Sequence, residues 1–119
     1  QYTEREMRRR VRKLWFKAHR AGGIDLLLTH APAGGLNDGF DKAHKGFETF
    51  NGLLEDYQPK WFVHGHVHLN YDAKLPRVCT HGRTTVINAT ERYLFEIPDP
   101  DQTARRKFFW KNPAFTTEN

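Results

Sequence analysis

Three histidines follow apolar segments in a pattern that can bind metal ions. His30 stands in the step 29–32 (Thr-His-Ala-Pro), and His66 and His68 stand in the run 64–68 (His-Gly-His-Val-His). Imidazole is the commonest metal-ligating side chain near neutral pH. In extended backbone, residues two apart point to the same side and lie about 6.5 Å apart, so His66 and His68 can reach two neighbouring ions. The sequence therefore predicts metal ligands at His30, His66 and His68.

A pair of divalent ions favours phosphate-ester hydrolysis. Such ions bind a phosphate ester, lower the pKa of a bound water to make hydroxide, and neutralise charge on the oxygens during displacement. Imidazole-rich sites with mixed nitrogen and oxygen ligands suit Mn²⁺, Fe or Zn²⁺ better than Ca²⁺. The expected cofactors are two such divalent metal ions, and the expected partner is a phosphate-ester substrate.

The histidines have other interpretations. His64 points away from His66 in extended backbone, so we interpret it as a core residue or as one that supports the ligands. The pattern His-x-His-x-Asp-His, typical of the metallo-β-lactamase fold, does not fit this segment, because reading from His64 places His68 where aspartate is required. A purely structural role for the histidines is the remaining alternative.

Two helix–strand units must position these residues. A predicted helix spans residues 3–21, where Thr3 and Glu6 have capping-box spacing and the apolar residues repeat at helical spacing: Met7, Val11, Leu14, Trp15 and Ala18. The pair Gly22–Gly23 favours a helix stop. The apolar run 24–29 then predicts a strand buried on both faces.

The second unit follows a loop. Residues 31–41 are rich in Gly, Pro, Asn and Asp, which predicts a functional loop. A second helix is expected over 43–57, ending before Pro59, with one apolar face: Phe47, Phe50, Leu54 and Tyr57. The run 61–63 predicts another buried strand, which ends at the turn 64–68. Both histidine segments then follow strand carboxyl ends, where open α/β sheets bind ligands.

The last third of the chain is predicted as strands and a tail. Residues 70–83 are polar and turn-rich, whereas 84–89 and 92–97 predict two strands joined as a hairpin. Asn88 is expected to satisfy backbone groups near the end of the sheet. Residues 99–119 mix charge with aromatics, and we interpret them as an edge segment and tail rather than a nucleic-acid patch.

Length and composition limit the class of protein. The 119 residues form one small domain, and the single cysteine, Cys79, excludes an internal disulfide and fits a reducing compartment. No apolar run approaches the roughly 20 residues that span a bilayer. We therefore expect a cytoplasmic protein without a membrane partner. The chain starts at Gln1 directly in a helical pattern, so we expect it to be a fragment.

Positive charge is concentrated in the first helix. The chain has a formal charge of +5, and residues 1–20 contain eight Lys or Arg against Glu4 and Glu6. These cations mostly flank the apolar stripe, as on a solvated helix face. The alternative hypothesis is a nucleic-acid- or protein-binding module that uses this helix, with structural histidines. Nucleic acid is therefore a possible partner, although not the favoured one.

Two of the motifs resemble a known enzyme family. The segments 29–32 and 65–68, in this order and at this spacing, are similar to the last two motifs of calcineurin-like metallophosphoesterases. The likeness extends over about 24–97, because 41–46 (Asp-Lys-Ala-His-Lys-Gly) and 85–89 (Thr-Val-Ile-Asn-Ala) also look like bacterial and phage members.

The resemblance implies a fold and an activity. The expected fold is α/β, namely the C-terminal half of a metallophosphoesterase αββα sandwich with two main helices and about four strands. Residues 1–98 would form this portion of the domain, and 99–119 would form the edge segment and tail. The implied activity is metal-dependent hydrolysis of a phosphomonoester or phosphodiester at a binuclear site. His30 and His66 would ligate one ion and His68 the other.

Three family motifs are absent from the chain. Asp-x-His, Gly-Asp-x-x-Asp and Gly-Asn-His, which precede the Thr-His-x-Pro step in the family, do not occur. Three neutral imidazoles lack an anionic bridge between two dications, so we expect the metal ions to be weakly held or absent in this fragment. The missing N-terminal half of the domain is the implied partner. His44 is a candidate contact to the substrate phosphate at a helix N-terminus, or equally a surface or capping residue.

Overall fold

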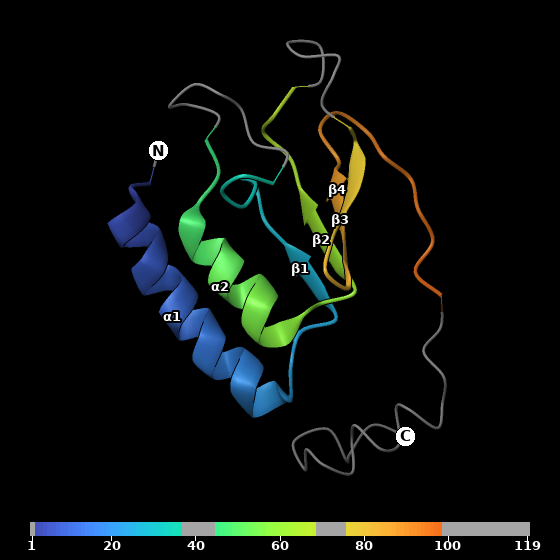
Figure 1. Cartoon of the computed structure of the whole chain (residues 1–119). Helices are drawn as coiled ribbons and strands as arrows, with labels where there is room; N and C mark the ends of the chain where they lie inside the picture. The colour runs from blue at the N-terminus through green and yellow to red at the C-terminus, as the bar shows by residue number, and fades with distance from the viewer. Residues whose placement is uncertain (1, 37–44, 69–75, 99–119) are drawn as a thin grey trace.

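The computed structural model describes residues 2–36, 45–68 and 76–98 (Figure 1). The predictions for residues 37–44, which include His44, and for the tail 99–119 lie outside these described residues.

Two helices and a four-stranded mixed sheet make up the described part of the chain, which is an α/β fold. The helices are α1 (Glu4–Ala21) and α2 (Glu48–Tyr57), and the strands are β1 (Leu26–Leu28), β2 (Trp61–His64), β3 (Val78–His81) and β4 (Thr84–Asn88). The sheet order is β1-β2-β4-β3. β1, β2 and β4 are parallel, and β3 is antiparallel to β4. The helices lie side by side on one face of the sheet (Figure 1).

α1 begins and ends where the sequence predicts. The backbone N–H of Glu6 donates to the Thr3 hydroxyl over 3.3 Å, and the Thr3 N–H donates to the Glu6 carboxylate over 2.8 Å, which completes a capping box. Hydrogen bonds from Thr3 hold the pKa of Glu6 below its ordinary value. Gly22 ends the helix in the left-handed conformation, at φ 87°. Neither described helix combines the length and apolar composition that a membrane span needs.

α2 begins later than the predicted residue 43. Lys45 and Gly46 are not helical, and Phe47 is an extended cap residue that forms a parallel bridge with Ala33. A Cβ atom added to Gly46 would collide with the carbonyl of Ala33, so this approach requires glycine. The bridge therefore keeps the chain extended up to Phe47, against the helical periodicity.

The N-terminus of α2 is capped by a side chain of α1. The helix has no side-chain cap of its own, but the Glu4 carboxylate accepts the N–H groups of Glu48 and Thr49 over 3.1 and 2.7 Å. Farther along, the Trp15 indole N–H donates to Asp56 over 3.0 Å and the Tyr57 hydroxyl donates to the Trp15 carbonyl over 2.8 Å. Burial raises the pKa of Tyr57, and the charge of Asp56 adds to this effect. The two helices therefore dock as one unit.

The core lies between α2 and the sheet. Leu27, Phe62 and Val86 stand next to each other in the strand register and are almost fully buried. They contact three buried side chains of α2: Phe50, Leu53 and Leu54. This alternation fixes which face of each strand meets the helices.

The prediction that β1 is buried on both faces is wrong. Leu27 is buried, whereas Leu26 is 40% exposed and Leu28 is 71% exposed. β1 is an edge strand of the sheet, whereas Val63 of the neighbouring strand, in register with Leu28, is buried. The apolar run thus belongs to a strand at the border of the described sheet, where two of its three side chains stay exposed.

The predicted hairpin is also wrong in its strands. The hairpin consists of β3 and β4 joined through Gly82 and Arg83, and residues 92–97 form no strand. Gly82 has φ 59°, and glycine at the first position of a two-residue turn suits a hairpin. After β4 the chain turns sharply instead, since the Arg92 N–H bonds to the Thr90 carbonyl over 3.0 Å around Glu91 at φ 68°.

Candidate metal centre

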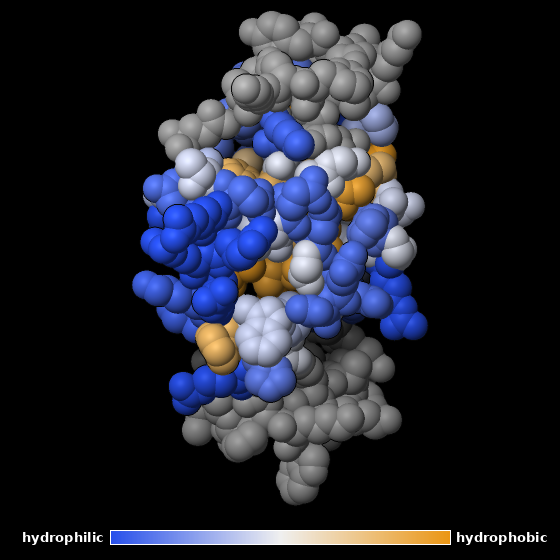
Figure 2. Space-filling view, turned by 60° about the vertical axis from the view of Figure 1, so that its left-hand side comes forward, coloured by the Kyte–Doolittle hydropathy of each residue, from blue (hydrophilic) through white to orange (hydrophobic). Residues whose placement is uncertain are grey.

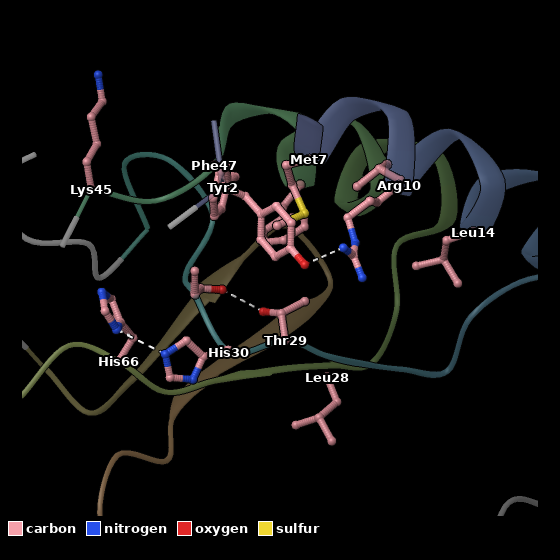
Figure 3. Close-up of a pocket in the computed structure, with 13 residues that line it drawn as sticks. Tyr2, Met7, Arg10, Leu14, Leu28, Thr29, His30, Lys45, Phe47 and His66 are labelled. Carbon is pink, nitrogen blue, oxygen red and sulfur yellow. Dashed lines mark hydrogen bonds between the residues drawn. The ribbon is translucent and has the colours of Figure 1, made fainter. Parts of the chain in front are cut away.

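The structure brings His30 and His66 together at one edge of the sheet. β1 and β2 are parallel neighbours, so the residues that follow them leave the sheet side by side. Nε2 of His30 lies 3.0 Å from Nδ1 of His66, and the ring centroids are 4.8 Å apart (Figure 3). The two ring nitrogens therefore face each other at hydrogen-bond distance.

Backbone hydrogen bonds hold the pair. The Thr29 N–H donates to the Val63 carbonyl over 3.0 Å, and the Gly65 N–H donates to the His30 carbonyl over 2.9 Å. The pairing of the two chains thus continues past the ends of β1 and β2. The position of each imidazole is set by the main chain as well as by its rotamer.

His66 occupies an unusual turn. Its φ is 70°, and the Val67 N–H donates to the Gly65 carbonyl over 2.8 Å, which makes His66 the central residue of a γ-turn. A non-glycine residue in this region costs of the order of 1–3 kcal/mol and is often found at a functional site. The assumption of extended backbone over residues 64–68 is therefore wrong, because the strand ends at His64 and the chain turns at His66.

His68 follows His66 by two residues, and its side chain is exposed. In residues 2–36, 45–68 and 76–98, no three or more His, Cys, Asp or Glu side chains lie close enough together to hold a metal ion. The described part of the chain thus supplies the His30–His66 pair, and His68 stays a predicted ligand. His44, the predicted phosphate contact, lies outside the described residues.

The geometry of the pair fits one side of a metal site. With metal–nitrogen bonds of about 2.0–2.1 Å and tetrahedral angles, two ligand nitrogens on one Zn²⁺ lie about 3.3 Å apart. The observed 3.0 Å separation differs from this by a movement of a few tenths of an ångström. Without metal, the two rings can share a hydrogen bond if one nitrogen carries the proton and the other accepts it. Two imidazoles leave at least two coordination positions for other ligands.

Asn88 locks the turn that carries His66. Its side chain is 1% exposed, and its Nδ2 donates to the Val67 carbonyl over 2.8 Å. Its Oδ1 accepts the Thr90 N–H over 3.0 Å. The expectation that Asn88 satisfies backbone groups at the end of the sheet is confirmed, and one of those groups belongs to the histidine turn itself.

Arg77 is a supporting residue that the sequence did not reveal. Its Nη1 donates to the carbonyls of Asn88, Thr90 and Arg92 at 3.1, 3.4 and 3.3 Å. Its guanidinium also lies over the Tyr93 ring, 5.5 Å from the centroid. Arg77 stands in a stretch that reads as a polar turn, and the carbonyls it binds come together only in the folded chain.

His64 belongs to the core, as interpreted from the sequence. It is 1% exposed, its Nδ1 lies 3.1 Å from the Gly65 carbonyl oxygen, and its ring packs 5.5 Å from that of Phe62. The Ala89 N–H also donates to the His64 carbonyl over 2.7 Å. His64 thus anchors the start of the histidine turn between β2 and β4.

A cavity of about 600 Å³ lies beside the histidine pair. Its walls come from α1, β1 and the start of α2, and they are mostly apolar: Met7, Val11, Leu14, Leu28, Phe47 and Phe50. Arg10 and Lys45 also line it, and both are exposed. In the space-filling view, apolar surface lies in a hollow bordered by hydrophilic surface (Figure 2). The volume is in the range of small-molecule sites.

No protein-family model matches the chain, and no solved structure matches it. The chain is similar to UPF0046 protein T07D4.2 of Caenorhabditis elegans, with 29% identity over 102 residues. The matched region covers 76% of this chain and 24% of the relative. The chain thus spans about a quarter of the length of this curated relative.

Proposed function

We propose that this chain contributes metal ligands to a binuclear metallophosphoesterase, which hydrolyses a phosphomonoester or phosphodiester with two divalent ions. His30 and His66 would ligate one ion and His68 the second. The observation that carries the proposal is the convergence of the His30 and His66 ring nitrogens, 3.0 Å apart, beyond two adjacent parallel strands.

The strain at His66 favours a ligand role over a simple hydrogen bond. A hydrogen bond between two side chains stabilises a protein by about 0.5–1.5 kcal/mol, and less where solvent competes. Holding a histidine at φ 70° costs of the order of 1–3 kcal/mol. The hydrogen bonds of Asn88 and of the Gly65 N–H also hold this turn. A bound metal ion, which would add stability to the folded state only, would contribute further to offsetting its cost.

The surroundings of the pair suit an anionic substrate. Arg10 and Lys45 line the adjacent cavity, so its walls carry positive charge as well as apolar groups. When bound, the ions supply a water of lowered pKa and neutralise charge on the phosphate oxygens. The protein's own part is to fix the ligands, through Asn88 and the paired backbone, and to keep positive charge near the incoming phosphate.

The remaining ligands are proposed to come from the N-terminal half of the domain. Two features support this part of the proposal. The side chains of Leu26 and Leu28 on the edge strand β1 are exposed in the described residues, as expected if another part of the domain packs against them. The relative is also about four times longer than the matched segment.

Metal titration of this chain tests the proposal without any turnover. Zn²⁺ and Mn²⁺ are titrated into the wild type, His30→Ala and His66→Ala by calorimetry in a non-chelating buffer. Because two imidazoles alone hold a metal ion weakly, we expect weak binding by the wild type and at least a tenfold loss of affinity in both variants. His81→Ala is the matched control, because His81 pairs with Thr84 at the opposite end of β4 from Asn88. Equal affinity in wild type, His30→Ala and His66→Ala would overturn the assignment.

Hydrolysis is tested in the longest natural polypeptide that contains the chain. p-Nitrophenyl phosphate and bis(p-nitrophenyl) phosphate distinguish monoesterase from diesterase activity. We expect metal-dependent turnover that is lost in His66→Ala and kept in His81→Ala. Turnover that is unchanged by chelator and by His66→Ala would show that the histidine pair does not take part in hydrolysis.

A further inference from the structure

The solvent face of α1 carries five cations without an acidic partner. Arg5, Arg8, Arg9, Arg12 and Lys13 are all exposed, and none of them forms an ion pair with a carboxylate in the described part of the chain. At helical spacing Arg5, Arg9 and Arg12 follow each other on one side of the helix. The five positions span about 12 Å along the axis, at 1.5 Å per residue. We call this surface, together with Phe16, the α1 basic face.

The two acidic residues of α1 are engaged elsewhere. Glu6 is held by the Thr3 N–H and hydroxyl, at 2.8 and 2.9 Å, and Arg9 affects it only through its charge. Glu4 is bound to the N-terminus of α2. Neither carboxylate forms an ion pair with a guanidinium group of this face in the described part of the chain, so the α1 basic face keeps a net positive charge.

An exposed aromatic ring continues the cationic row. Phe16 lies four residues after Arg12, on the same side of the helix, and is 59% exposed. Its ring meets the edge of the Trp15 ring at a centroid distance of 5.4 Å, so it is held in place while part of it faces solvent. Cations next to an exposed aromatic ring form the combination that binds phosphates and stacks bases in single-stranded nucleic acids.

We propose that the α1 basic face binds single-stranded nucleic acid. The guanidinium groups contact successive phosphates, and Phe16 stacks on a base. A membrane surface is a poorer fit, because an interfacial helix inserts its apolar face, and the apolar face of α1 packs on α2 and the cavity. The proposal does not rest on the metal site, since the α1 basic face contains none of the histidines.

Fluorescence anisotropy with a labelled oligo-dT 20-mer in EDTA tests the proposal. For single strands, log K falls with log salt by about 0.7 per phosphate contact, so five contacts predict a slope of about −3.5. Between 50 and 200 mM salt the affinity should then fall about 100-fold. In the triple variant Arg5→Gln, Arg9→Gln and Arg12→Gln, the slope should become shallower by about 2 and the loss should shrink to about 7-fold.

A second triple variant controls for net charge. Lys60→Gln, Arg83→Gln and Arg92→Gln remove the same charge from exposed positions outside α1 and should leave the slope near that of the wild type. Phe16→Leu should weaken binding about 5-fold or more at every salt concentration without changing the slope. Circular dichroism confirms that each variant is folded.

Three results would overturn the proposal: no binding at 50 mM salt, equal loss in both triple variants, or binding to phosphatidylserine vesicles that depends on the same arginines and exceeds binding to the oligonucleotide. Because chelator is present throughout, none of these results bears on the histidine pair. The experiments therefore distinguish a failure of nucleic-acid binding by the α1 basic face from a failure of metal binding by the histidine pair.

Discussion

Substitution of His66 by glycine and by alanine separates its strained backbone from its proposed role as a ligand. Both variants lose the ring contact with His30, so this loss cancels between them. At φ 70° a side chain costs about 1–2 kcal/mol that glycine avoids. Glycine also gives the unfolded chain more freedom, which costs about 0.4–1 kcal/mol relative to alanine. We therefore expect His66→Gly to exceed His66→Ala in free energy of unfolding by about 0.5–1 kcal/mol.

Urea unfolding followed by circular dichroism measures this difference. For a domain of this size it corresponds to an increase in Tm of about 2–6 °C in the glycine variant. Added Zn²⁺ should raise the Tm of the wild type and of neither variant, because a ligand that binds only the folded state stabilises it. If His66→Ala were as stable as His66→Gly, the left-handed turn would carry no cost, and the argument that a ligand compensates for it would be lost.

Four further substitutions test the framework around the site. Gly46→Ala should destabilise the fold by more than 2 kcal/mol, because the added Cβ meets the Ala33 carbonyl. Gly52→Ala lies in open space within α2 and should stabilise the fold by about 0.5–1 kcal/mol. Thermal melts of both variants check these values. Glu4→Ala removes the cap of α2 and should cost about 1 kcal/mol in urea unfolding, and unchanged stability would contradict the capping role. The pKa of Glu6 is below its usual 4.5 in the folded chain, so its contribution is complete above pH 4.5 and is lost as pH falls through the lowered pKa. Acid titration of Tm should therefore be flatter in Glu6→Gln than in the wild type below pH 4.5.

Local signals in the sequence predicted much of the fold. The capping box of Thr3 and Glu6 and the stop at Gly22 place α1 correctly, because both depend on residues that are near each other in the chain. The start of α2 was missed, since the approach of Ala33 to Gly46 and Phe47 keeps these residues extended. A long-range contact overrode the local periodicity there.

Strand burial and pairing were harder to predict. An apolar run such as Leu26–Leu28 predicts a buried strand, but it does not show which of the two faces of the strand another layer of the fold covers. The hairpin was misplaced because Val78–His81 contains polar residues on its exposed side, while the more apolar 92–97 looked like the better strand. Gly82, beside Arg83, was the available turn signal.

The sequence predicted that His30 and His66 meet, but not the local geometry of their contact, and metal binding by His30, His66 and His68 stays a prediction. Since parallel strands end at a common edge, the motifs were sufficient to bring His30 and His66 together. The spacing of two residues predicts extended backbone and gives no signal of the turn at His66. Arg77 acts on carbonyls 11 to 15 residues away, and no sequence pattern marks such a role.

The cap that Glu4 provides for α2 has a consequence for how the chain folds. The first N–H groups of α2 find their acceptor 44 residues earlier, at the very start of α1. A ten-residue helix without a cap of its own is too short to persist in water. α2 should therefore become ordered only as α1 docks, so that the two helices form one cooperative layer.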